Sequence, residues 1–196
     1  MPMIVYGDSG SGNCLKVKWV ARALGVPFEW REVDIMTGTT RTPDYLAMNP
    51  AGQVPTVVLE DGRTLAQSNA IILHLAEGSA LIPEDAYERA KMLEWLFWEQ
   101  YSHEPAIAVA RFRMKFLGQP REALDPKLVE RGEAALARLE LQLQQTPFLV
   151  GQALSLADVA LAAYTRWAHE GGFELVSRPA IREWIGRVEL ALAITD

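Results

Sequence analysis

The first candidate site is a polar, glycine-rich loop that lies between a short apolar run and a helical pattern. It reads Ser9-Gly10-Ser11-Gly12-Asn13-Cys14. A helix N-terminus presents backbone N–H groups and the positive end of the helix dipole, so it favours an anion. A hydroxyl, amide or thiol here can stabilise an anion or become one. The structural alternative is that Ser11 or Asn13 only caps the helix and that Cys14 is a small buried side chain.

Two further segments carry groups of the same kind. Pro55 follows Gln53 and Val54 at the start of a strand-like run, where a proline is tolerated because it donates no ladder hydrogen bond. A cis peptide would leave the backbone of Val54 available to an extended, peptide-like ligand, whereas a trans peptide would make this an ordinary turn. At the start of a helical pattern, Ser68 offers either a cap or a hydroxyl and backbone amides for a carboxylate.

Apolar periodicity predicts the elements that position these groups. Strands are expected at residues 3–6, 28–33, 54–59 and 63–66, and the last two flank Glu60-Asp61-Gly62, which is typical of a hairpin. Val17, Val20, Ala21 and Leu24 form one helical face that ends at Gly25, a second helix follows Ser68, and residues 38–43 are expected to be loop. The order βαβ-ββα predicts a mixed sheet, with the three candidate segments at the same end of its strands.

After Pro83 the pattern becomes entirely helical. Residues 86–117 form a long helical tract that Pro105 is expected to kink or break. Two apolar stripes follow, and a last helix is expected from about Arg182; the stripes comprise Val129, Leu136, Leu139 and Leu143, then Leu156, Val159, Ala160, Ala163 and Trp167. The predicted organisation is an α+β domain over residues 1–78, a linker over 79–85 and an all-helical domain over 86–196.

Composition excludes several classes of function. The chain has 196 residues, 49% of them hydrophobic, and a formal charge of −6, which argues against a nucleic-acid binder. One cysteine excludes an intrachain disulfide framework and favours a reducing, cytoplasmic location. The sequence contains no long apolar run, so neither a signal peptide nor a membrane span is expected. The three histidines form no H-x-x-x-H pattern, so no metal is expected.

In their order and spacing, these motifs resemble those of the cytosolic glutathione transferases. The matching segments are Ser11-Gly-Asn-Cys-x-Lys-Val, Asn49-Pro-x-Gly-Gln-Val-Pro55, Leu65-Ala-Gln-Ser68-x-Ala-Ile, Leu81-Ile-Pro83 and Phe148-Leu-Val-Gly-x-x-Leu-Ser155-Leu-Ala-Asp158. In the last, Ser155 and Asp158 form an S-x-x-D helix cap. The resemblance covers nearly the whole chain. It implies a thioredoxin-like domain followed by a helical one, a cis Pro55, and a cytoplasmic homodimer with a role in detoxification.

The resemblance also implies a set of roles at a glutathione site, with glutathione as co-substrate and no cofactor. Ser11 is expected to stabilise the glutathione thiolate, assisted by Asn13, with Ser9 as a fallback and Tyr6 mainly in the core. Val54, preceding Pro55, is expected to pair with the cysteinyl backbone, supported by Gln53. Further expected contacts are Gln67 and Ser68 to the γ-glutamyl end and Arg41 to the glycine carboxylate. Similar enzymes commonly have an acid where this chain has Gln67.

The expected reaction is conjugation of glutathione to a small electrophile, with peroxide reduction as a second activity. A first alternative is a thiol–disulfide oxidoreductase in which Cys14 forms a mixed disulfide with glutathione. A second is a non-enzymatic binding module of the same fold. The helical domain is expected to meet the second substrate, and the polar tract around Pro105 supplies candidate pocket residues: Tyr101, His103 and Arg111.

Overall fold

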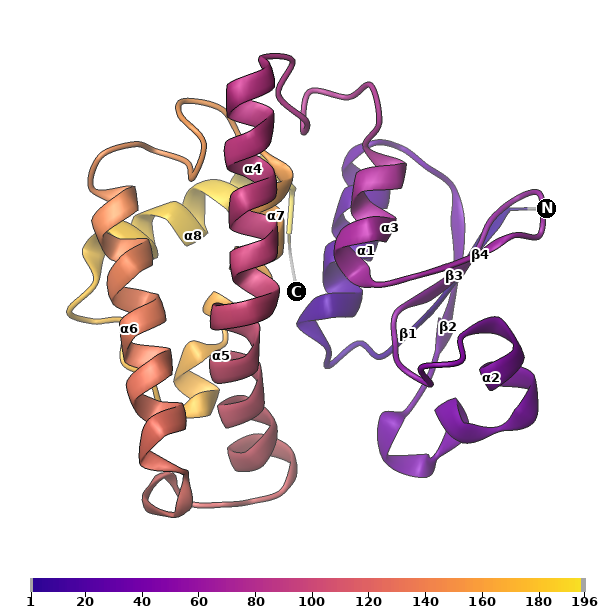
Figure 1. The fold of residues 1–196 in the computed structure, drawn as a ribbon, viewed down its shortest axis with the longest axis horizontal. Coiled ribbons are helices and arrows are strands. Elements are labelled where there is room, and N and C mark those ends of the chain that lie inside the picture. Colours follow the sequence, from indigo (N-terminus) through magenta and orange to yellow (C-terminus); the bar gives the residue numbers. More distant parts are fainter. Residues whose placement is uncertain (1, 195–196) are drawn as a thin grey trace. The chain divides into compact units, whose positions relative to one another are not determined.

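The computed structural model describes residues 2–194 of the chain, which divides into two units, Met1–Ser79 and Ala80–Asp196 (Figure 1). The division falls at the first residue of the predicted linker, 79–85. Leu81 belongs to the second unit, where it is buried and its carbonyl oxygen accepts a hydrogen bond from the Leu156 N–H at 3.0 Å. No helix within residues 2–194 is long and apolar enough to cross a membrane.

The described residues of the first unit form a four-stranded sheet, which is mixed as predicted, and its strand order is β2-β1-β3-β4. Its strands are β1 (Met3–Gly7), β2 (Phe28–Glu32), β3 (Thr56–Val58) and β4 (Thr64–Ala66). The strand β1 runs parallel to β2 and antiparallel to β3, and the β3–β4 hairpin turns at the predicted Asp-Gly pair. A parallel pair needs a crossover, which is supplied by the helix between β1 and β2.

Two helices pack against each other in this unit, α1 (Gly12–Ala23) and α3 (Ser68–Leu75) (Figure 1). Their apolar faces are buried together with the centre of the sheet; the fully buried members include Val5, Val17, Val20, Ala21, Val57, Ile71 and Ile72. Ser68 is the first residue of α3 and not its cap, because the N-cap position is occupied by Gln67.

The expected loop at residues 38–43 is more regular than predicted. The 3₁₀ turn η1 (Ile35–Thr37) precedes it, a second 3₁₀ turn, η2 (Thr39–Arg41), lies within it, and a short helix, α2 (Pro43–Met48), begins at its last residue. The hydroxyl of Thr42 caps α2 by accepting from the Tyr45 N–H at 3.4 Å, and Pro43 occupies the first helical turn. The sequence Thr-Pro-Asp therefore carried a helix-start signal that apolar periodicity alone did not reveal.

The described part of the second unit is helical throughout. The long tract comprises α4 (Ala86–Trp98), the π-helical turn η3 (Glu99–His103), α5 (Glu104–Arg111) and a second π-helical turn, η4 (Phe112–Phe116). Pro105 does not break the tract, because the preceding π turn changes the local hydrogen-bond pattern where the proline provides no N–H. The 3₁₀ turn η5 (Arg121–Ala123) and α6 (Pro126–Leu143) follow.

The remaining helices are α7 (Leu156–Thr165), the 3₁₀ turn η6 (Ala168–Gly171) and α8 (Pro179–Ala191). The last helix begins three residues before the predicted Arg182, because Pro179 occupies its first turn. The predicted cap of α7 is present: the buried Asp158 carboxylate accepts from the Ser155 N–H and hydroxyl, both at 2.9 Å. It also accepts from the Leu149 N–H at 2.8 Å and the Trp184 indole at 2.9 Å.

Candidate functional site

The register of the sheet brings the three predicted segments to one end of it. Tyr6 in β1 pairs with Thr56 in β3, and Thr56 pairs with Ala66 in β4. The polar loop follows β1 at this end, the Val54–Pro55 peptide immediately precedes β3, and Gln67 immediately follows β4 at the start of α3. The juxtaposition expected from the strand order is therefore a consequence of hydrogen-bonded register.

The N-terminus of α1 carries the serine and asparagine of the polar loop. Ser11 occupies the N-cap position, and its carbonyl oxygen accepts from the N–H groups of Cys14 and Leu15. Within the described residues its hydroxyl forms no capping hydrogen bond to α1, so capping by the side chain does not explain this serine. Asn13 lies in the first turn, half-buried, and its Oδ1 accepts from the Ser68 hydroxyl at 3.1 Å.

A buried lysine that the sequence analysis did not single out joins these two helices. The Lys16 side chain is 0% exposed, and its Nζ donates to Asn13 Oδ1 at 2.8 Å. It also donates to Ser68 Oγ and to Asn69 Oδ1, both at 3.4 Å. The signal was its spacing: Lys16 precedes Trp19 and Val20 by three and four residues, and both lie on the buried face of α1.

Before β3, the Val54–Pro55 peptide is cis, as the resemblance implied. The chain around it is held by the Gln53 carbonyl oxygen, which accepts from the Tyr45 hydroxyl at 2.9 Å, Asn49 Nδ2 at 2.8 Å and the Thr56 hydroxyl at 3.1 Å. The backbone N–H and C=O of Val54 bond to no other residue that the structure describes. An extended ligand could pair with them as a further strand would.

Arg41 lies against the turn that precedes this peptide. Its Nη1 donates to the Ala51 carbonyl oxygen at 3.1 Å, while most of the side chain is exposed. A Cβ at Gly52 would collide with the guanidinium and with the Thr40 carbonyl, and the φ angle of +60° also favours glycine. Gly52 thus allows the exposed Arg41 side chain to lie against the turn at Ala51 and Gly52.

The start of α3 has an unusual backbone. Gln67 has a φ of 70° and a ψ of 110°, and its side chain is exposed. A non-glycine residue in this region costs on the order of 1–3 kcal/mol, and such residues concentrate at functional sites. Ser68 is 5% exposed, and its hydroxyl takes part in the hydrogen bonds with Asn13 and Lys16 described above. A carboxylate at this position would therefore interact with the backbone amide of Ser68 and with the positive end of the α3 dipole.

Cys14 lies in the first turn of α1, next to Asn13, but is fully buried. Burial raises the pKa of its thiol from 9.0 to about 12, and hydrogen bonds with the Ser11 side chain and the Asp8 backbone only partly oppose this. The thiolate is the form that attacks a disulfide. A buried thiol that stays protonated is poorly suited to the exchange mechanism in which Cys14 would form a mixed disulfide with glutathione.

The hydroxyls of Ser9, the fallback of the sequence analysis, and of Tyr6, which was expected mainly in the core and is half-buried, both bond to residues of β2. Ser9 Oγ donates to a Glu32 carboxylate oxygen at 2.7 Å, and the Ser9 N–H donates to the other at 2.7 Å. Although partial burial acts to raise the pKa of Glu32, the hydrogen bonds from Ser9 and Trp30 outweigh it and lower that pKa. The Tyr6 hydroxyl accepts from Arg31 Nη1 at 2.8 Å.

The three residues expected around a second substrate do not share a surface. Tyr101 is 82% exposed, but His103 is 0% exposed and its Nε2 lies 2.9 Å from the Thr165 hydroxyl. Arg111 is 3% exposed, donates to Glu170 at 2.5 Å and stacks 4.1 Å from the Trp167 ring. The expectation was wrong for His103 and Arg111, which stabilise the interior of the helical unit. The π turn at Glu99–His103 changes the helical phase, so spacing did not predict their faces.

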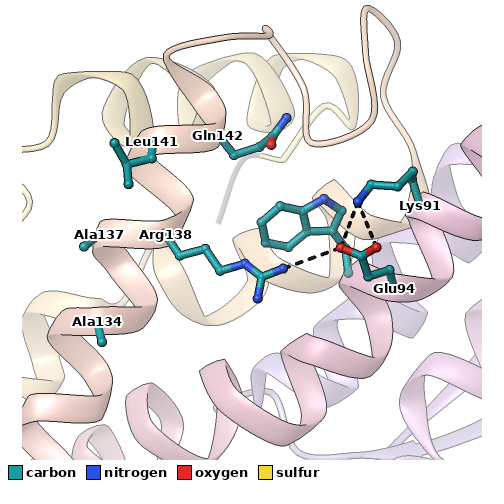
Figure 2. Close-up of a pocket in the computed structure, with 8 residues that line it drawn as sticks. Lys91, Glu94, Ala134, Ala137, Arg138, Leu141 and Gln142 are labelled. Atoms are coloured by element: carbon teal, nitrogen blue, oxygen red, sulfur yellow. Dashed lines mark hydrogen bonds and ion pairs between the residues drawn. The ribbon is translucent and has the colours of Figure 1, made fainter.

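The second unit has an open groove of about 570 Å³ between α4 and α6 (Figure 2). Within it, Glu94 pairs with Lys91 at 2.8 Å and with Arg138 at 3.6 Å, and the Arg138 guanidinium lies over the rings of Trp95 and Trp98. The lining, as far as the chain is described, includes none of the side chains predicted for the site. Nor do residues 2–194 contain a group of three or more His, Cys, Asp or Glu side chains that could hold a metal ion.

Comparison with known proteins gives a consistent relationship for both units. The glutathione S-transferase N-terminal domain model matches residues 10–77, and the C-terminal domain model matches residues 95–190. Glutathione S-transferase 3 of Zea mays is 31% identical over 93% of this chain and 87% of its own length. The crystal structure of a glutathione S-transferase from Pseudomonas fluorescens is 49% identical, with a TM-score of 0.93 over 96% of this chain and 95% of that one.

Ure2p in complex with glutathione has a TM-score of 0.89 over 98% of this chain and 96% of its own, and at 21% identity this likeness shows the fold alone. The family models cover both units, and the maize relative aligns with most of the chain at more than 30% identity. The mixed sheet followed by a helical unit is the thioredoxin-like arrangement that the resemblance implied. The chain therefore belongs to the glutathione S-transferase family of enzymes.

Proposed function

We propose that this protein binds reduced glutathione in its first unit, stabilises the thiolate and transfers it to a small electrophile. The observation that carries the proposal is the convergence of the α1 N-terminus, the α3 N-terminus and the cis Val54–Pro55 peptide at one end of the sheet. Two helix dipoles and the Val54 backbone groups there suit a tripeptide that carries a thiolate and carboxylates. In the reaction the sulfur forms a bond to carbon while the electrophile releases a leaving group or gains a proton.

Each end of glutathione has a partner of suitable chemistry. The γ-glutamyl carboxylate would lie at the start of α3, near Gln67 and the Ser68 backbone amide, and the cysteinyl backbone would pair with Val54. The glycine carboxylate would meet the exposed guanidinium of Arg41, which can form paired hydrogen bonds to a carboxylate. The sulfur would then lie at the α1 N-terminus, where the Ser11 hydroxyl and the Asn13 amide donate to it. Glutathione acts as a co-substrate, and we propose no cofactor.

Titration of the bound thiol tests this proposal. Ultraviolet absorbance of the thiolate, followed against pH in the protein–glutathione complex, should give a pKa well below that of free glutathione. Ser11→Ala should raise this pKa by about one to two units, because a hydrogen bond to a charged group contributes about 1.5–3 kcal/mol. Ser9→Ala is the matched control, since the Ser9 hydroxyl donates to Glu32. An unchanged pKa in Ser11→Ala would remove Ser11 from this role, and calorimetry without binding would favour the non-enzymatic alternative.

Turnover assays then address the reaction. Conjugation of glutathione to an aryl halide should depend on Ser11, and the same assay with an organic hydroperoxide tests the expected second activity. The Cys14-dependent alternative predicts that Cys14→Ala abolishes glutathione–disulfide exchange. The burial of Cys14 opposes that alternative, so conjugation should survive the substitution.

A homodimer is also proposed, in a cytoplasmic location. Large apolar or aromatic side chains of the helical unit are exposed: Phe97 at 75%, Tyr101 at 82% and Leu141 at 65%. A homodimer would bury side chains of this kind against a second copy of the chain. Sedimentation at micromolar concentration should give twice the 21.8 kDa of the chain, and Phe97→Ser should shift it towards monomer. A wild-type protein that sediments only as monomer would refute the dimer.

A further inference from the structure

The buried lysine of α1 has an arrangement that core packing alone does not explain. Lys16 is 0% exposed, and a buried lysine nitrogen is costly unless hydrogen bonds replace its hydration. Three of its hydrogen bonds go to Asn13, Ser68 and Asn69, which belong to the first turns of α1 and α3. Its side chain therefore links the two helix N-termini at which the proposed function places the thiolate and the γ-glutamyl carboxylate.

These contacts determine which way the Asn13 amide points. A lysine ammonium has donors only, so the Asn13 atom 2.8 Å from Lys16 Nζ must be the carbonyl oxygen. The Ser68 hydroxyl is compatible with this polarity, because it accepts from Lys16 and donates to the same Oδ1 at 3.1 Å. With Oδ1 held towards Lys16 and Ser68, the Nδ2 group is directed to the opposite side of the amide. A flipped amide would place two donors face to face.

We propose that Lys16 is a positioning residue that holds the Asn13 amide with its N–H groups directed at the glutathione sulfur. This inference rests on the proposed function and adds a residue to it. Lys16 itself, being buried, does not touch the substrate; it acts through the Asn13 side chain and, by its bonds to Ser68 and Asn69, keeps the start of α3 aligned with the start of α1. Loss of its donors would leave the amide able to rotate and present its oxygen to the thiolate.

The test compares bound-thiol titrations in Lys16→Met and in Lys18→Met. Methionine has nearly the length of lysine but no donor, and the control residue lies on the same helix, where its nitrogen packs 5.3 Å from the Trp30 ring centroid. In Lys16→Met the thiol pKa in the complex should rise by about one unit, which is about tenfold less thiolate at a pH below that pKa. Lys18→Met should keep the wild-type value.

A double-mutant cycle shows whether Lys16 acts through Asn13. In an Asn13→Ala background, Lys16→Met should add little to the change in thiol pKa, because the group it positions is already absent. Additive shifts, or an unchanged pKa in Lys16→Met, would overturn the inference while leaving the proposed function intact. A wild-type protein that binds no glutathione would overturn both.

If Lys16→Met does not fold, Asn13→Asp provides a second test of the orientation of the Asn13 side chain. The carboxylate can still accept from Lys16 and Ser68, so the fold should be retained, but an oxygen replaces the amide nitrogen on the side of the sulfur. The thiol pKa in the complex should then rise above the wild-type value. A low thiol pKa retained in Asn13→Asp would mean that the Asn13 N–H groups do not face the sulfur, and the orientation assigned to Lys16 would be wrong.

Discussion

Alkylation of Cys14 distinguishes an enzyme that activates the glutathione thiol from one that exchanges disulfides through its own cysteine. The chain has one cysteine, so the modification signal has a single source. Burial raises the pKa of the Cys14 thiol from 9.0 to about 12. At neutral pH, each increase of one pKa unit lowers the thiolate fraction about tenfold. Native Cys14 is therefore expected to hold about a thousandfold less thiolate than an ordinary cysteine. Only the thiolate reacts appreciably with iodoacetamide.

The assay measures the alkylation rate at neutral pH by mass spectrometry, in native buffer and in denaturant. The native rate should be at least about a thousandfold lower, because full burial of the sulfur adds to the low thiolate fraction. The Cys14→Ala variant, which should show no modification, is the control. A native rate within about tenfold of the denatured rate would refute both the burial argument and our preference for thiolate activation over exchange.

The same thiol makes stability fall at alkaline pH. The folded-state pKa of about 12 exceeds the reference value of 9.0, so the native state binds more protons between these values. The stabilising contribution is therefore complete below about pH 9 and is lost as pH rises towards 12, by on the order of 4 kcal/mol for three units. Urea titrations should show a steeper alkaline loss in wild type than in Cys14→Ala. Parallel curves would contradict this.

Three further substitutions test hydrogen bonding, backbone strain and packing within the two units. Asp158→Asn should lower the free energy of unfolding by about 2–4 kcal/mol in urea titration, because the amide nitrogen would face donors that now bind a carboxylate. Gln67→Gly should raise that free energy by about 1 kcal/mol by relieving the positive φ, yet weaken glutathione binding in calorimetry; a loss of stability would argue against strain. Gly132→Ala should cost about 1–3 kcal/mol, because a Cβ there overlaps the buried Phe173 ring, and an unchanged melting temperature would show that the ring can move.

Local signals in the sequence were sufficient for the order of the strands, although apolar periodicity missed the short helix α2. The Asp61-Gly62 pair predicted the hairpin, and the S-x-x-D spacing of Ser155 and Asp158 predicted the cap of α7. These features depend on contacts between neighbours in the chain, so residue type and spacing carry the information. The position of the candidate segments at one sheet end also followed from strand order, because antiparallel and parallel strands bring their ends together in only a few ways.

Only the tertiary structure decided which side chains face the site and which face the core. Cys14 and Lys16 lie in the same turn as Asn13 and are both fully buried, whereas Tyr101 is exposed and His103, two residues on, is not. A π-helical turn shifts the helical phase at the latter pair, and no periodic rule anticipates it. The bond from Lys16 to Ser68 joins residues 52 positions apart. Such a contact exists only once α1 and α3 have packed, and so the amino-acid sequence determined the elements while their packing determined the chemistry each residue can perform.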